Sequence, residues 1–241
     1  MMSSNRRGFS EWSMKEIEGM PCQTRRLGEM VDVLYDRGFA ASADSSTSVY
    51  HVYRNIPFSP VAGEPSLQEL RYDATVIPPL MLGQEFPKTF GHYHAAGPGG
   101  LPHAEIYEVL TGTAHLLLQK NDKDAVVDVA LVEAGQGEKM LVPPGYGHLL
   151  INPTGETMVT GNLVSTKCVQ DNELFRRMRG GAYYELKESR FVKNLNYGEV
   201  PELRIEAPCS RFGHEGLRDL LVKDPDAFRF LVDPAKYFDA F

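Results

Sequence analysis

The sequence predicts a mainly β protein, folded as a closed antiparallel sandwich or barrel with helical extensions at both ends. Between residues 46 and 168 it contains a series of short segments that are rich in β-branched and aromatic residues. Gly, Pro, Asn or Asp bounds these segments about every ten residues, which is a strand-and-turn pattern. Strands so closely spaced leave no room for the crossover helices that a parallel sheet needs.

The first regular pattern in the chain is helical. The apolar residues of RRLGEMVDVLYDRGF (25–39) recur with helical spacing, at Leu27, Met30, Val31, Leu34 and Tyr35. The polar run ASADSSTS (41–48) follows and ends the pattern. We therefore predict an N-terminal extension over residues 1–45 that contains one helix.

The period changes after this break, and the predicted barrel covers residues 46–168. Its predicted strands are VYHVYRNI (49–56), LRYDATVI (70–77), AEIYEVLTG (104–112), TAHLLLQ (113–119), AVVDVALVEAG (125–135), EKMLVPPG (138–145), HLLINP (148–153) and TMVTGNLVS (157–165).

Helical patterns return in a C-terminal extension over residues 169–241. They lie in DNELFRRMRG (171–180) and LRDLLVKDPDAFRFLV (217–232). We expect these helices to pack outside the barrel or across a subunit interface, and the whole chain to form one structural domain.

Composition excludes some classes of partner. Of the 241 residues, 25 are Lys or Arg and 32 are Asp or Glu, so the net charge of −7 disfavours nucleic acid and anionic membranes as partners. The three cysteines are odd in number and far apart, which is typical of a reduced, cytoplasmic protein. No signal peptide and no membrane-spanning segment is expected from the sequence.

Four residues predict a metal site. His92 and His94, in TFGHYH, are two residues apart and share one face of a strand. Glu105 shares a face with Tyr107 on a later strand, and His148 follows a Pro-Pro-Gly turn. Three imidazoles and a carboxylate inside one barrel suit Fe, Mn, Ni, Co or Zn. Taken singly, each residue is better explained as a packed or solvated side chain, and only the four together favour a metal site.

The same residues resemble the paired motifs of the cupin superfamily. The second motif is matched throughout by Gly137, Pro143, Gly145, His148 and Asn152. In the first motif, His-x-His precedes a Glu that is separated by six residues from a Gly, as Glu105 is from Gly112. The resemblance implies a double-stranded β-helix, or jelly-roll barrel.

The gap between His94 and Glu105 is longer than the motif's usual spacing. His103 lies two residues before Glu105, on the same face, and is the alternative ligand.

A narrower resemblance covers residues 24 to about 165. TVIPPLMLGQEFPKTFGHYH, AEIYEVLTGTAHLLLQ and TRRLGEMVDVLYD are similar to segments of the cupin-type glucose-6-phosphate isomerases. The resemblance implies that His92, His94, Glu105 and His148 hold one divalent metal ion per chain, with Fe²⁺ favoured over Mn²⁺, Ni²⁺, Co²⁺ or Zn²⁺.

The resemblance also implies the substrate contacts. Thr75 and Tyr107 would line the sugar pocket, and Thr89 and Gly91 would contact the phosphate. Lys88 is a further candidate phosphate donor. A pocket tyrosine of the family falls near Val164 here, and Tyr183 or Tyr184 is the candidate to replace it.

The function implied is interconversion of glucose 6-phosphate and fructose 6-phosphate in glycolysis and gluconeogenesis, by a cytoplasmic homodimer. Glu105 would be the base that moves a proton between C2 and C1, and Tyr107 would donate a hydrogen bond to a sugar oxygen. Two alternatives remain open: a cupin Fe(II) dioxygenase, because the ligands are the same, and a non-catalytic sugar-binding cupin.

Overall fold

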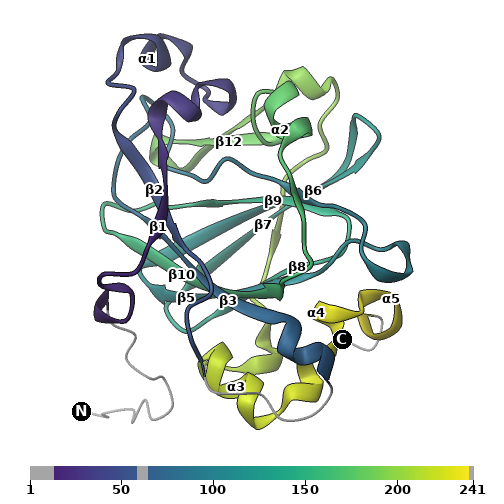
Figure 1. Cartoon of the computed structure of the whole chain (residues 1–241). Coiled ribbons are helices and arrows are strands. Elements are labelled where there is room, and N and C mark those ends of the chain that lie inside the picture. The colour runs from purple at the N-terminus through teal and green to yellow at the C-terminus, as the bar shows by residue number, and fades with distance from the viewer. Residues whose placement is uncertain (1–13, 59–64, 239–241) are drawn as a thin grey trace, which may run out of the picture.

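A computed structural model describes residues 14–58 and 65–238. Two sheets face each other and form a barrel, with helices packed above and below it (Figure 1). The arrangement confirms the mainly β, cupin-type jelly-roll prediction.

The larger sheet has six strands, and every neighbouring pair is antiparallel. In spatial order they are β1 (Cys22–Arg26), β2 (Ser48–Tyr53), β3 (Leu70–Ile77), β10 (Met158–Ser165), β5 (Glu105–Thr111) and β8 (Lys139–Val142).

The smaller sheet faces it and has four strands. In spatial order they are β14 (Arg204–Glu206), β7 (Ala125–Gly135), β6 (Thr113–Asp122) and β9 (Tyr146–Ile151). The β14 strand runs parallel to β7, and the other pairs are antiparallel. Two ribbons complete the strands: β4 (Tyr93–His94) with β11 (Gln170–Asp171), and β12 (Tyr183–Leu186) with β13 (Arg190–Lys193).

All eight strands predicted between residues 49 and 165 are present, as β2, β3 and β5 to β10. Several are buried along nearly their whole length, and every residue of β10 is buried. Their burial is continuous because both faces of the large sheet are covered. One apolar core fills the space between the sheets, and a second lies on the outer face of the large sheet under the C-terminal helices.

The helices are short. The α-helices are α1 (Arg37–Ser42), α2 (Glu173–Arg177), α3 (Leu217–Lys223), α4 (Arg229–Val232) and α5 (Pro234–Tyr237). The 3-10 helices are η1 (Met14–Ile17), η2 (Leu27–Glu29), η3 (Val31–Val33), η4 (Pro65–Glu69), η5 (Pro98–Gly100), η6 (Lys187–Ser189), η7 (Leu195–Tyr197), η8 (Ser210–Phe212) and η9 (Pro225–Phe228). No helix in residues 14–58 or 65–238 is long and apolar enough to span a membrane.

A buried carboxylate attaches the C-terminal helices to the barrel. Glu108 of β5 accepts hydrogen bonds from the Tyr72 hydroxyl at 2.6 Å and from the Leu217 backbone N–H at 3.0 Å. The predicted helix over residues 217–232 is broken in the middle at Pro225, because proline lacks an N–H donor and disfavours helical geometry in the residue before it.

The predicted N-terminal helix is wrong for most of its length. The arginines at its start belong to β1, where Arg25 pairs with Tyr50 of β2. Two 3-10 turns follow, and the only α-helix described in this segment is α1, whose first turn is capped by Asp36. Pairing to the sheet edge outweighs the weak helical preference of this segment. The sheets therefore include β1 and β14, which come from the predicted N- and C-terminal extensions.

Candidate active site

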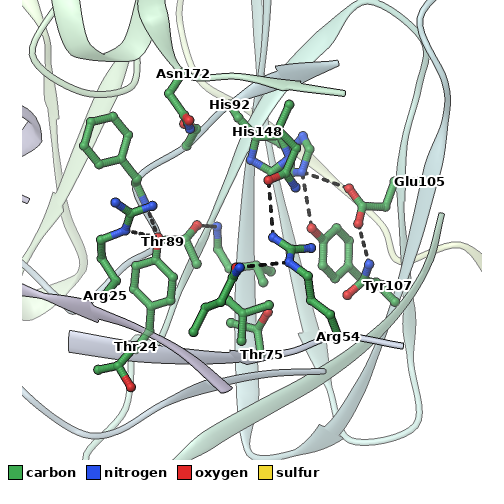
Figure 2. Close-up of a pocket in the computed structure, with 18 of the residues that line it drawn as sticks. Thr24, Arg25, Arg54, Thr75, Thr89, His92, Glu105, Tyr107, His148 and Asn172 are labelled. Carbon is green, nitrogen blue, oxygen red and sulfur yellow. Dashed lines mark hydrogen bonds and ion pairs between the residues drawn. The ribbon is translucent and has the colours of Figure 1, made fainter. Parts of the chain in front are cut away.

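A cavity of about 330 Å³ lies between the two sheets (Figure 2). Residues two apart on a strand point to the same face, so the large sheet lines one wall with alternate residues. Tyr50, Thr75, Tyr107 and Asn162 lie on that wall. Leu150 of the small sheet lines the opposite wall, together with the segment at residues 89–92.

Four side chains converge at this cavity, and they are the four predicted metal ligands. The ligand atoms of His92, His94, Glu105 and His148 all lie within 4.8 Å of one another. The Nε2 atoms of His94 and His148 are each 3.2 Å from Oε2 of Glu105. Figure 2 shows His92 and His148 side by side, with Glu105 opposite them.

Backbone pairing brings these residues together. The N–H of His92 donates to the His148 carbonyl at 3.1 Å, and the N–H of His148 donates to the His92 carbonyl at 2.9 Å. His94 lies two residues further on, in β4, and Glu105 begins β5.

Hydrogen bonds outside the cluster orient two of the side chains. Nδ1 of His94 lies 2.7 Å from the carbonyl of His103, which leaves Nε2 facing the cluster. Nδ2 of Asn162 donates to Oε1 of Glu105 at 2.5 Å, so Oε2 faces the histidines. Partners of this kind fix the orientation of metal-binding side chains.

Three of the facing atoms lack hydrogen-bond partners. Within the described chain, Nε2 of His92, Nε2 of His94 and Oε2 of Glu105 are buried and make no hydrogen bond. The 3.2 Å contacts to Glu105 are ion-pair contacts without hydrogen-bond geometry. Buried polar atoms rarely stay unpartnered, and these converge on one point, so the residues fit a bound cation. Three imidazoles and a carboxylate suit a divalent transition metal.

The electrostatics of the cluster agree with this donor set. Burial is the main cause that lowers the pKa of His92 well below its usual range, and it also lowers the pKa of His148, so both imidazoles are neutral. Neutral imidazole is the form that binds metals. Burial opposes ionisation of Glu105, but contacts with His148 and His94 hold its pKa well below the usual range.

His94 carries the proton in the metal-free cluster. Burial opposes its protonation, but contacts with Cys168 and Glu105 raise its pKa to about 10. Positive charge is thus favoured beside the carboxylate.

Glu105, and not His103, belongs to the cluster. Nδ1 of His103 lies 3.1 Å from the Leu231 carbonyl, and its Nε2 faces Gly97. The imidazole therefore packs between a loop and the C-terminal helices.

Tyr107 and Thr75 both line the cavity, as the resemblance implied. The Tyr107 hydroxyl lies 3.3 Å from Nε2 of His148. Burial, with a further contribution from Glu105, raises the pKa of Tyr107 well above its usual value. Tyr107 is thus a neutral hydrogen-bond donor next to the cluster.

Thr89 and Gly91 also line the cavity and have donors to offer. The Thr89 hydroxyl oxygen accepts from the Leu150 N–H at 3.0 Å, which leaves its hydrogen available. Gly91 has a φ of 89°, and a side chain there would collide with the ring of Phe175. This combination of hydroxyl and backbone donors suits an anion.

Two cavity residues carry positive charge and were missed in the sequence. Arg25 lies on β1, and Arg54 directly follows β2. Nε of Arg25 donates to the Tyr50 hydroxyl at 3.3 Å, which places Arg25 near Thr89 (Figure 2). The sequence carries no local signal for either residue, because both reach the cavity through the pairing of β1 with β2 and of β2 with β3.

Asn162 was also missed. It lies in the predicted strand over residues 157–165, and only the pairing of β10 with β5 shows that it reaches Glu105.

Three candidate residues lie elsewhere. The Tyr183 hydroxyl donates to the Pro201 carbonyl at 2.7 Å, and the Tyr184 hydroxyl to the Arg179 carbonyl at 2.5 Å. Neither lines the cavity, because β12 packs outside the small sheet. Lys88 is buried, forms an ion pair with Glu85 and donates to the Val33 carbonyl at 2.8 Å, so it is turned away from the site. We correct these three assignments.

The chain matches a known protein family. The family model described as glucose-6-phosphate isomerase matches residues 25–202, which include every residue of the cluster.

The chain belongs to the glucose-6-phosphate isomerase family.

Similar relatives within this family come from archaea. The glucose-6-phosphate isomerase of Pyrococcus furiosus is 31% identical over 145 residues, which cover 59% of this chain and 69% of that protein. The glucose-6-phosphate isomerase of Thermococcus gammatolerans is 33% identical over 144 residues, with the same coverage. The family match ends at residue 202, so β14 and α3 to α5 are additions to what the family model describes.

Several solved structures share a distant likeness with this member of the glucose-6-phosphate isomerase family. An oxalate oxidase aligns with a TM-score of 0.34 and 14% identity, over 43% of this chain and 46% of its own. A likeness at this level carries no argument about function.

Proposed function

We propose that this chain is a metal-dependent aldose–ketose isomerase (EC 5.3.1.9) that interconverts glucose 6-phosphate and fructose 6-phosphate. The observation that carries the proposal is the placement of the unpartnered cluster beside the donors of Thr89 and Gly91, in one cavity. A phosphosugar has a phosphate at one end and its reacting carbons at the other, and this cavity offers a matching group to each. The reaction is a step of glycolysis and gluconeogenesis, for which the expected location is the cytoplasm.

His92, His94, Glu105 and His148 would hold one divalent metal ion, with Fe²⁺ the first candidate and Mn²⁺, Ni²⁺, Co²⁺ or Zn²⁺ the others. When bound, such an ion supplies Lewis-acid stabilisation of negative charge on oxygen.

Glu105 is the candidate base. It would accept the proton from C2 of open-chain glucose 6-phosphate, while the C2–H electron pair forms a C1=C2 double bond and the carbonyl π pair moves to O1. The O2 proton passes to O1. Return of the proton from Glu105 to C1 then leaves the ketone at C2. Asn162 would hold the carboxylate in one orientation during both transfers.

The other residues bind and orient. Tyr107, a neutral donor, would hydrogen-bond a sugar oxygen near the cluster, and Thr75 would contact the sugar chain. Thr89 and the backbone at Gly91 would hold the phosphate.

A coupled isomerase assay tests the proposal. Chelator-treated protein should be inactive, and one or more of the five divalent metals should restore interconversion of the two hexose phosphates. Inactivity with every metal, together with O₂ uptake in the Fe²⁺-loaded protein, would favour the dioxygenase. Stabilisation by hexose phosphate without turnover would favour a sugar-binding protein.

An isotope experiment tests the role of Glu105. Glucose 6-phosphate deuterated at C2 should lose part of its label to water, because a carboxyl group exchanges its proton. Complete retention of deuterium at C1 would point to a direct hydride shift, and Glu105 would then act only as a ligand.

We also propose a homodimer. Open sheet edges need cover, and β1 is an edge strand of the large sheet near the N-terminus. Light scattering should give twice the chain mass at micromolar concentration, and a monomer mass would refute the dimer.

A further inference from the structure

Arg54 is held rigidly at the cavity by three different elements. Its Nη1 donates to Oδ2 of Asp73 at 2.9 Å, its Nε to Oε1 of Gln23 at 3.2 Å, and its Nη2 to Oε1 of Gln170 at 3.4 Å. These partners lie on β3, β1 and β11. A long side chain with contacts on three strands has already lost most of its freedom before any ligand binds.

Strand register places Arg54 beside the reacting groups. Asp73 of β3 pairs with Asn162 of β10, and Asn162 pairs with Tyr107 of β5. Arg54 is bound to Asp73, at one end of this cross-strand row, and Tyr107 is at the other. Figure 2 shows the Arg54 guanidinium beside Tyr107 and below His148.

The charge of Arg54 is not neutralised by its surroundings. Asp73 is buried, and its Oδ2 also accepts from Nε of Arg71 at 2.9 Å. One carboxylate is therefore shared by two guanidinium groups. The three side chains together keep a net positive charge, and of the two arginines only Arg54 lines the cavity.

We infer that Arg54 is a further catalytic residue, whose guanidinium contacts the oxygens at C1 and C2 of the open-chain sugar. The inference rests on the isomerase function proposed above. Negative charge develops on these two oxygens as the proton leaves C2. A planar guanidinium donates two parallel hydrogen bonds, a geometry that matches two oxygens on adjacent carbons.

Arg54 itself neither gains nor loses a proton, because a guanidinium stays charged in proteins. Its effect is electrostatic. Donors fixed before the reaction stabilise developing charge without reorganising. Arg25 serves the other end of the substrate, because it lies beside Tyr50 and Thr89.

Two matched variants separate catalysis from structure. Arg54→Gln and Arg71→Gln each remove one guanidinium from the same oxygen of Asp73, but only the first removes a cavity residue. Loss of one preorganised donor typically costs about 10²–10³-fold in kcat. We expect a fall of that order for Arg54→Gln, with metal content unchanged, and a much smaller fall for Arg71→Gln, because Asp73 then offsets the charge of Arg54 but the Arg54 donors stay at the cavity. Equal kcat values for the two variants would overturn the inference.

A binding measurement gives a readout that a structural role would not move. Two unreactive probes share the phosphate but differ at C1: 6-phosphogluconate carries a carboxylate, and glucitol 6-phosphate carries an alcohol. Charged hydrogen bonds contribute about 1.5–3 kcal/mol, so Arg54→Gln should reduce the preference for the carboxylate about tenfold or more. Arg71→Gln should keep the preference, and an unchanged preference in Arg54→Gln would refute the contact.

The proposed function and this inference fail in different ways. A wild-type protein that does not isomerise with any metal refutes the function. An active wild type whose Arg54→Gln variant behaves like Arg71→Gln refutes only the role of Arg54.

Discussion

The two oxygens of Glu105 have different neighbours. Asn162 donates to Oε1, while Oε2 faces His94 and His148. One carboxylate can therefore offer Oε2 to a cation and keep Oε1 in a fixed position towards the cavity. Coordination of both oxygens to a cation would weaken the carboxylate as a base. Coordination through Oε2 alone would let Glu105 act both as a ligand and as a base.

The variant Glu105→Gln tests this division. Its amide oxygen can take the place of Oε2 towards the proposed cation, and the Asn162 amide can turn to accept from its amide nitrogen, but neither amide atom can accept a proton as a carboxylate does. Loss of a general base typically costs about 10²–10⁴-fold, and we expect kcat to fall by that factor in the metal-loaded variant. Metal content must be measured on the same sample. Turnover near that of the wild type with metal bound would remove the base role.

Gly91 has no room for a side chain. A Cβ would lie 2.5 Å from the Phe175 ring, and the backbone has a positive φ. Gly198 has a φ of 75°, and a Cβ there would meet nothing within 4 Å, so it is the matched control. Both alanine variants carry backbone strain, but Gly91→Ala adds a steric clash of about 1–3 kcal/mol. Urea unfolding should show that difference, and equal losses would mean that Phe175 moves aside freely.

At the scale of the element, β1 has two faces with different roles. Arg25 lines the cavity, whereas Arg26 is exposed and donates to the Ser46 carbonyl at 2.7 Å. The strand therefore supplies one arginine to the cavity, where Glu29 is its ion-pair partner at 3.3 Å, and one arginine to the surface.

The pair Arg25→Gln and Arg26→Gln tests the role of β1. Hydrogen bonds to charged groups contribute about 1.5–3 kcal/mol, so Arg25→Gln should raise KM for the hexose phosphates about tenfold or more. The Arg26→Gln variant should leave KM near the wild-type value. Steady-state kinetics over a range of salt concentrations measures both, and equal KM values in the two variants would contradict a phosphate contact of Arg25.

The anchor of α3 gives a prediction about pH. Burial raises the pKa of Glu108, and the hydrogen bond from Tyr72 opposes that rise. The folded state therefore holds this proton to higher pH than the unfolded chain, so the stability linked to Glu108 is present at low pH and is lost as pH rises through the raised pKa. Tyr72→Phe removes the opposing donor and should destabilise the fold by about 1–3 kcal/mol.

The loss in Tyr72→Phe should be larger at about pH 8 than at about pH 5, because an ionised carboxylate needs the donor more. Unfolding in denaturant at both pH values measures it. A loss that is independent of pH would mean that Glu108 does not change its protonation across this range.

The sequence was sufficient for the barrel strands and for the four side chains that meet at the cavity, because both depend on local spacing. The motif around His148 and the His92–His94 pair can be found without knowing the fold. Arg54 and Asn162 could not be found in this way, because their roles depend on register across β2, β3, β10 and β5. The helical spacing of residues 25–39 predicted the wrong structure for a related reason. The pairing of β1 with β2 joins residues that are far apart in the sequence.

At the scale of the whole molecule, a metal ion bound at the cluster would stabilise the fold. Removal of the ion leaves buried, unpartnered atoms inside the barrel. A ligand present at 1,000 times its Kd stabilises by about 4 kcal/mol. Chelation should therefore lower Tm by several degrees, and Fe²⁺ or another transition metal should restore it.

Two histidine variants provide the control for the metal experiment. His92→Asn removes a cluster residue and should abolish the metal-dependent shift in Tm. His103→Asn alters a buried histidine outside the cluster and should keep that shift. The same shift in both variants would place the ion elsewhere in the protein.

The strand order of the large sheet also governs how the chain folds. β3 pairs with β10, with Leu70 opposite Ser165, so the sheet cannot close until the end of the barrel segment has been synthesised. Non-local pairing of this kind makes folding slow, on the order of milliseconds to seconds. His148 and Asn162 arrive last, so a nascent chain holds His92, His94 and Glu105 before the remaining ligand exists. Ribosome-bound chains that end before β9 should therefore bind the metal weakly, and metal loading should follow barrel closure.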